Sequence, residues 1–128
     1  LSALSFIVGI IGIMNIMFVS VSERTKEIGI RKAVGAKKAV ILMQFITESV
    51  VLCLIGAMIS FIGCSLLILG IALVVPQFVP DLDFLPKILP ANMFAIATLF
   101  AVFFGVLAGF IPAVKAAQLD PVEALRYE

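Results

Sequence analysis

Very few residues in this sequence could carry out acid–base, nucleophilic or metal chemistry. Histidine, the commonest general base and metal ligand, is absent from the sequence. Cys53 and Cys64 lie in one apolar run, where a helix would place them roughly 16 Å apart along its axis, too far for a disulfide bond. No carboxylate pair falls inside the long apolar runs, which argues against an intramembrane enzyme. The sequence therefore predicts no catalytic residue and no metal site.

The charged residues gather instead in residues 22–38, SERTKEIGIRKAVGAKK. Glu27 and Arg31 lie one helical turn apart, in the order that stabilises a helix. Ile30 and Val34 share this spacing and form a narrow apolar stripe. Gly35 follows where a helix C-terminal glycine belongs, so we expect this helix to end there. The pattern predicts a short amphipathic helix that docks onto a cytoplasmic protein. The alternative is a basic connecting loop with no partner, and composition alone favours this alternative. Nucleic acid is not an expected partner, because no aromatic residue interleaves with the basic ones.

The composition requires the elements around this segment to be membrane helices. Hydrophobic residues make up 63% of the chain and charged residues 13%, with a mean hydropathy of +1.28, whereas a soluble chain is about a quarter charged. The uncharged runs at residues 1–21, 49–75 and 91–111 each reach the about 20 residues of helix that cross a bilayer. The expected fold class is an all-α membrane protein with three transmembrane helices, in contact with the lipid bilayer, and a short cytoplasmic helix between the first and second.

Orientation follows from the connecting segments, because lysine and arginine mark the cytoplasmic side. Basic residues dominate the first connector, whereas the second carries Asp81 and Asp83 beside a single Lys87. We expect the first connector and the C-terminus in the cytoplasm and the N-terminal end outside. The expected parts are a transmembrane helix (residues 1–21), a cytoplasmic helix and turn (22–38), a long helix with the second span (39–75), an extracytoplasmic proline-rich loop (76–90), a transmembrane helix closed by Pro112 (91–112) and a cytoplasmic tail (113–128).

Small residues recur at the spacing that lets membrane helices pack closely. Gly56 and Ser60 lie one turn apart, as do Gly105 and Gly109. Asn15, deep in the first span, needs a hydrogen-bond partner that a neighbouring helix could supply. For all of them we favour packing among the spans of one chain over a specific dimer face, and we interpret Asn15 as structural.

Three further features receive structural interpretations. Glu48 lies about 15 Å along a helix from Lys38, and the apolar run after it spans a membrane by itself, so we expect Glu48 at the cytoplasmic interface rather than in a proton relay. In the tail, Asp120 followed by Pro121 resembles the start of a capped helix. The outer connector is expected to be a stiff loop, with contact to a periplasmic or cell-surface partner left open, because it contains Pro76, Pro80, Pro86 and Pro90.

Two stretches carry a resemblance to a known family. Residues 9–38, GIIGIMNIMFVSVSERTKEIGIRKAVGAKK, resemble the signature of the MacB/FtsX-like ABC transporter permease family, in which an apolar span leads into a coupling helix. The end, IPAVKAAQLDPVEALRYE, resembles the C-terminus of the same family. With the matching order of spans between them, the resemblance covers essentially the whole chain.

The resemblance implies a permease that works as a homodimer with two ATP-binding subunits or domains. In such a permease, the coupling helix sits in a cleft of the ATPase and passes ATP-driven motion to an extracytoplasmic domain, which is called mechanotransmission. The glycines would allow close approach, Ile28 and Ile30 would be apolar anchors, and the charges would fix register. The ATPase-coupling residues implied in this way are Glu27, Ile28, Gly29, Ile30, Arg31, Lys32, Gly35 and Ala36.

The same resemblance implies what this chain does not do alone. No phosphate-binding G-x-x-x-x-G-K-[ST] motif occurs, so we expect no cofactor in the chain itself and ATP use by a partner or fused ATPase. The family's first span and extracytoplasmic domain would precede Leu1. The leading hypothesis is an export or extraction permease of a bacterial inner membrane, with a membrane-fusion or periplasmic protein as a further candidate partner. The alternatives are a signalling permease that regulates a cell-wall hydrolase and a lone membrane-anchoring module.

Overall fold

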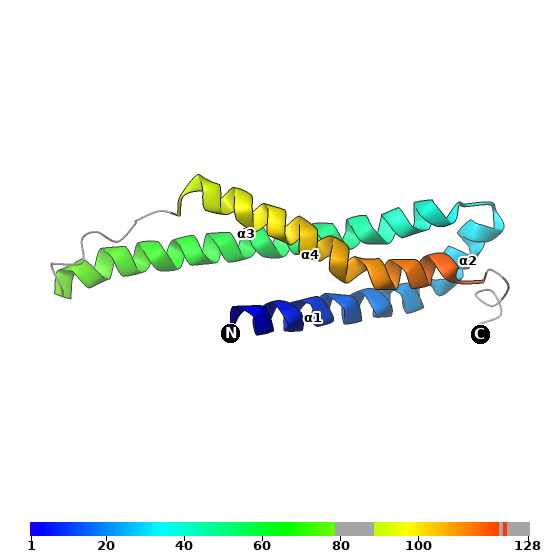
Figure 1. Cartoon of the computed structure of the whole chain (residues 1–128), viewed down its shortest axis with the longest axis horizontal. Coiled ribbons are helices and arrows are strands. Elements are labelled where there is room, and N and C mark those ends of the chain that lie inside the picture. Colours follow the sequence, from blue (N-terminus) through cyan, green and yellow to red (C-terminus); the bar gives the residue numbers. More distant parts are fainter. Residues whose placement is uncertain (79–88, 121, 123–128) are drawn as a thin grey trace.

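The computed structural model describes residues 1–78, 89–120 and 122, and it confirms the all-α fold class. Three of its helices are long and apolar enough to cross a membrane. They lie lengthwise beside one another, and a short helix sits at one end, next to the end of the last long helix (Figure 1). In chain order the helices are α1 (Ser2–Glu23), α2 (Thr25–Ala33), α3 (Lys38–Phe78) and α4 (Ala91–Gln118).

The turn from α2 into α3 is set by Gly35. Its φ of 100° lies in the left-handed region, where a side chain would be strained. Ala36 N–H donates to Arg31 O at 2.9 Å, and Gly35 N–H donates to Lys32 O at 3.0 Å. This pair of bonds is the Schellman arrangement, which satisfies the last carbonyls of a helix. The predicted glycine at the helix C-terminus is therefore confirmed.

Proline ends neither long helix where the sequence predicted it. Pro112 was expected to close the third span, but it is buried inside α4, which continues to Gln118. A proline removes one backbone hydrogen bond, and membrane helices tolerate this because neighbouring helices pack against the site. Similarly, α3 runs past Pro76 to Phe78, although the loop was expected from residue 76. Of the other prolines in that loop, Pro90 lies directly before α4. Pro80 and Pro86 lie outside the described residues.

The closest helix contact is between α3 and α4 and is made by small residues. A Cβ atom on Gly105 would lie 2.8 Å from Val50 Cα, and one on Gly109 would overlap Ser49 Oγ. Ser49 Oγ also donates across the contact to Gly105 O at 2.9 Å. Packing by Gly105 and Gly109 within one chain is therefore found.

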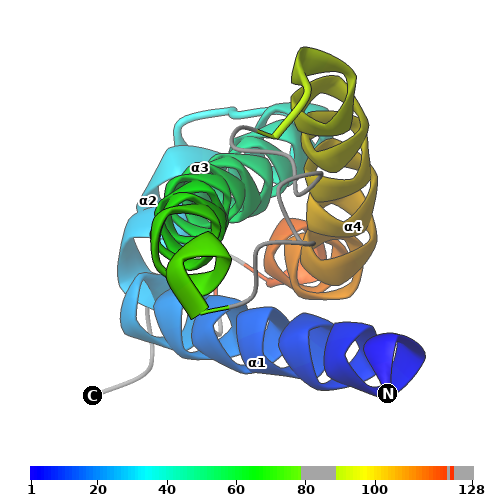
Figure 2. The same ribbon diagram turned by 90° about the vertical axis from the view of Figure 1, so that its left-hand side faces the viewer.

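The other residues predicted to pack helices together, Gly56, Ser60 and Asn15, do not take part in this contact. Gly56 and Ser60 are exposed, with open space around Gly56, and Asn15 is exposed on α1. Their role in helix packing stays a prediction. The helix α1 lies along one side of the other two long helices (Figure 2). It packs mainly on α4, where Phe6 stacks on Phe104 with ring centroids 4.7 Å apart.

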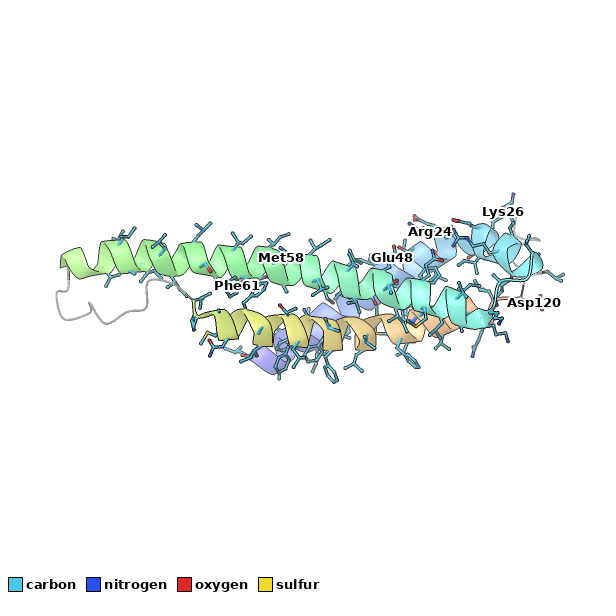
Figure 3. All side chains as sticks on the ribbon, turned by 90° about the horizontal axis from the view of Figure 1, so that it is seen from above. Arg24, Lys26, Glu48, Met58, Phe61 and Asp120 are labelled. Atoms are coloured by element: carbon cyan, nitrogen blue, oxygen red, sulfur yellow. The ribbon has the colours of Figure 1, made fainter. Side chains whose placement is uncertain are left out.

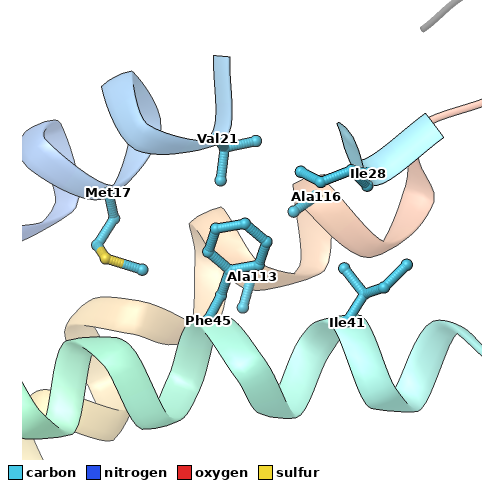
Figure 4. Packing of buried hydrophobic residues seen from close by; sticks show 7 residues of the cluster. All are labelled: Met17, Val21, Ile28, Ile41, Phe45, Ala113 and Ala116. Atoms are coloured by element: carbon cyan, nitrogen blue, oxygen red, sulfur yellow. The ribbon is translucent and has the colours of Figure 1, made fainter. Parts of the chain in front are cut away.

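The buried side chains concentrate at the end of the bundle that holds α2, which we call the base. Phe45 and Ile41 extend from α3 toward the side chains of α1, α2 and α4 (Figure 4). Away from the base, most apolar side chains of α3 and α4 point outward (Figure 3). The cluster at the base is made of Met17, Val21, Ile28, Ile41, Phe45, Ala113 and Ala116.

Candidate functional site

The helix α2 has one face against the base and one face exposed. Ile28 and Gly29 are buried, and only 4% of Ile28 is exposed. Ile30 and Val34 are 49% and 85% exposed. Because successive helical residues turn by about 100°, Ile28 and Ile30 must point to different sides of the helix. This division separates residues that fix α2 to its own chain from residues that can meet another protein.

The inner face anchors α2 through Ile28. Its side chain belongs to the cluster at the base, with Ile41 of α3 and Ala116 of α4 nearby (Figure 4). The sequence predicted Ile28 and Ile30 together as apolar anchors for a partner. In this conformation Ile28 is covered by its own chain, because the alanines at the end of α4 leave room for a large side chain there. Of the two, Ile30 is the residue that a partner can reach.

Lys32 ties the same inner face to the end of α4. Its Nζ donates to Ala117 O and to Leu119 O, both at 2.6 Å. These carbonyls lie at the C-terminus of α4, where backbone oxygens lack helical donors and a positive charge is favourable. Burial lowers the pKa of the Lys32 ammonium from its usual value, Lys38 lowers it further, and Asp120 acts in the opposite direction.

The two hydrogen bonds of Lys32 to the end of α4 could not be predicted from the sequence. The family resemblance implied a role for Lys32 in contact with an ATPase, together with Glu27 and Arg31. Its partners are backbone atoms more than 80 residues away, and backbone atoms leave no sequence signal. In addition, the third span was expected to end at Pro112, so the carbonyls of Ala117 and Leu119 were not expected to lie at a helix C-terminus.

Arg31 joins α2 to α3 on a more open side. Its Nη2 donates to Glu27 Oε1 at 2.6 Å, as the spacing predicted, and its Nη1 donates to Gln44 Oε1 at 2.7 Å. Nearly half of the Arg31 side chain is exposed, so solvent screens the ion pair and its contribution to stability is small, about 0–1 kcal/mol. We interpret the pair as orienting Arg31 rather than holding the fold together.

Glu48 has a partner that the sequence analysis did not identify. Arg24 Nη1 lies 3.7 Å from Glu48 Oε2, so the pair joins the junction between α1 and α2 to α3 (Figure 3). Both side chains are partly exposed, and the pair lies beside the base rather than midway along α3. The geometry is that of a charge pair at the edge of the apolar span.

In the tail, Asp120 Oδ1 accepts a hydrogen bond from Val122 N–H at 2.9 Å, as an N-cap residue does.

The outer face of α2 is the part of the site that remains open. Ile30, Ala33 and Val34 are all exposed and lie at the spacing of one helix face. Lys26, one turn before Ile30, is exposed as well (Figure 3). Among the described residues, no three His, Cys, Asp or Glu side chains come together to hold a metal ion. What this surface offers is a small apolar stripe beside positive charge, which suits binding to a protein.

Comparison with known proteins gives this arrangement a context. The sequence profile described as FtsX-like permease C-terminal matches residues 1–121. The Bacillus subtilis (strain 168) protein named "Uncharacterized ABC transporter permease YknZ" is 45% identical over 128 residues, which is all of this chain and 30% of that protein. The Campylobacter jejuni (strain 81-176) "Macrolide export ATP-binding/permease protein MacB" is 46% identical over 99% of this chain and 19% of that protein. The chain thus spans less than a third of the length of these curated relatives.

Proposed function

We propose a function for this chain from one premise: it belongs to the FtsX-like permease family. As the last three spans of an ABC-type permease, it passes movement of an ATP-binding subunit or domain to the membrane helices. The segment α2 is the coupling helix and lies in the cytoplasm. ATP is bound and hydrolysed by the partner, and the permease acts as a pair in a bacterial inner membrane. Export is the favoured activity, because several relatives carry the name "Macrolide export ATP-binding/permease protein MacB".

One observation supports this proposal above the others, namely that α2 is held by one face and open on the other. A helix that transmits movement must be firmly attached to what it moves and must also present a surface to what moves it. Ile28 and Lys32 supply the attachment, and Ile30 and Val34 supply the surface. The basic residues around α2 favour the cytoplasmic side. A coupling helix must also bind the ATPase differently in its nucleotide states, since otherwise it transmits nothing.

The test measures binding of the ATP-binding subunit to the full-length permease that contains this segment. Val34→Asp places a charge in the exposed stripe, and we expect it to weaken binding by about tenfold or more, equivalent to at least about 1.4 kcal/mol. Val40→Asp is the matched control, because Val40 is 61% exposed at the start of α3. It should bind the subunit as the unchanged protein does. Equal binding by both variants and the unchanged protein would overturn the assignment of the stripe.

A further inference from the structure

The chain connects α2 directly to α1 and to α3, but not to α4. Residue 24 alone separates α1 from α2, and residues 34–37 join α2 to α3. Movement of α2 therefore reaches these two helices through the backbone. The helix α4 follows α3 only after residues 79–90, so movement of α2 reaches α4 directly only through side-chain contacts.

Two kinds of contact join α2 to α4, and they resist different movements. Ile28 packs in the cluster with Ala113 and Ala116, and such apolar contacts oppose compression but have no preferred direction. Lys32 makes two directional bonds, each 2.6 Å long, to carbonyls on either side of the end of α4. Charge-assisted bonds to two fixed acceptors oppose both separation and sliding.

We propose that Lys32 is the positioning residue that makes α4 follow α2. This inference rests on the proposed function, because it concerns movement that an ATP-binding partner imposes on α2. Lys32 does not itself meet the partner, since its ammonium group is directed at the end of α4. Its place between the open face of α2 and the last turn of α4 makes it a link from the cytoplasmic surface to the third span.

A link differs from a simple helix cap in what happens when the partner changes state. A cap stabilises the end of α4 equally in every state of the partner. A link keeps the distance between α2 and α4 constant while both move, so its loss is seen only when the partner drives α2. The distance between the two helices, measured in two nucleotide states, distinguishes these roles.

The experiment uses the full-length permease with its ATP-binding subunit in lipid nanodiscs. Cys53 and Cys64 are replaced by alanine, and spin labels are placed at Thr25→Cys, a partly exposed residue of α2 outside its open face, and at Ile111→Cys, an exposed residue of α4. Double electron–electron resonance is recorded without nucleotide and with a non-hydrolysable ATP analogue. Labelled permease is mixed with an excess of unlabelled permease, so that distances within one copy dominate. We expect one narrow distance population that is the same in both states when Lys32 is present.

Lys32→Met keeps an unbranched, flexible side chain only one atom shorter and removes the ammonium group. We expect its distance distribution to match that of the parent without nucleotide and to shift, by more than the parent's width, with the analogue. Lys32→Arg, which retains charge and donors, should restore the single distance. Lys37→Met, at an exposed lysine of the following turn, should behave as the parent does.

Two results would overturn the inference: distances in Lys32→Met that match the parent in both states, or an equal broadening in both states, which a cap alone explains. Binding of the ATP-binding subunit is measured on the same samples. Lys32→Met should retain that binding, whereas Val34→Asp should lose it. Unchanged distances with intact binding contradict the role of Lys32 alone, and unchanged binding by Val34→Asp contradicts the proposed function alone.

Discussion

The base of the bundle and its opposite end are built from similar residues but packed very differently. At the base, Phe45 is 1% exposed and Met17 is fully buried. Toward the opposite end, Leu67 of α3 and Leu99 of α4 are 67% and 71% exposed. The helix α3 also extends beyond the start of α1 and of α4 at that end (Figure 1).

The difference shows where the chain determines its own arrangement. At the base, side chains from all four helices fill one cluster, and polar bonds such as Ser49 to Gly105 and Lys32 to the end of α4 add direction. At the other end, the exposed surfaces are suited to lipid or to further membrane helices, since lipid solvates apolar side chains as well as protein does. A movement imposed at the base therefore meets a packed unit, whereas the other end can rearrange at lower cost.

The largest expected effect comes from removing the central side chain of the base. Phe45→Ala should lower the free energy of unfolding by about 3 kcal/mol or more, because it leaves a cavity that the surrounding helices cannot fill. Phe103→Ala on α4 is the matched control, since Phe103 is 58% exposed and lies away from the cluster. Its expected cost is under about 1 kcal/mol, as for most surface substitutions. Unfolding in mixed micelles with increasing SDS measures both. Similar losses for both would remove the distinction between the two regions.

A smaller effect is expected where α3 and α4 cross. Gly105→Ala introduces a Cβ atom 2.8 Å from Val50 Cα, and because that neighbour is backbone, one helix must shift. The expected loss is about 1–3 kcal/mol, the usual cost of overpacking. Gly63→Ala on α3 has open space and should be neutral or stabilising, since alanine favours helices. The same SDS titration compares them, and a stable Gly105→Ala variant would mean that the crossing is looser than described.

The sequence was sufficient to predict the helices, but it was insufficient to predict which face of each helix packs against the rest of the chain. Long uncharged runs and Gly35 predict the spans and the end of α2, because both depend on local chain properties. Which side of α2 faces its own bundle is not local, so Ile28 and Ile30 looked equivalent. Ala113 and Ala116, which lie in the same cluster as Ile28, belong to a helix only because α4 continues past Pro112, and the sequence did not predict that continuation.

The site was predicted to the same limited extent. The charge pair of Glu27 and Arg31 follows from helical spacing and is present. The bonds of Lys32 and the pair of Arg24 with Glu48 depend on how separate helices meet, and no pattern within one segment encodes that. Among the charged residues of the site, the interaction that could be predicted is the one whose partners lie within one helical turn.

The central claim is that the open face of α2 lies in the cytoplasm and is covered by an ATP-binding partner. The most direct measurement is the labelling rate of a single cysteine at Val34, in the full-length permease lacking Cys53 and Cys64, with a thiol reagent that does not cross membranes. We predict rapid labelling in inside-out vesicles, slower labelling when the ATP-binding subunit is added, and none in intact spheroplasts. Labelling from the outside of intact spheroplasts would contradict both the orientation and the function.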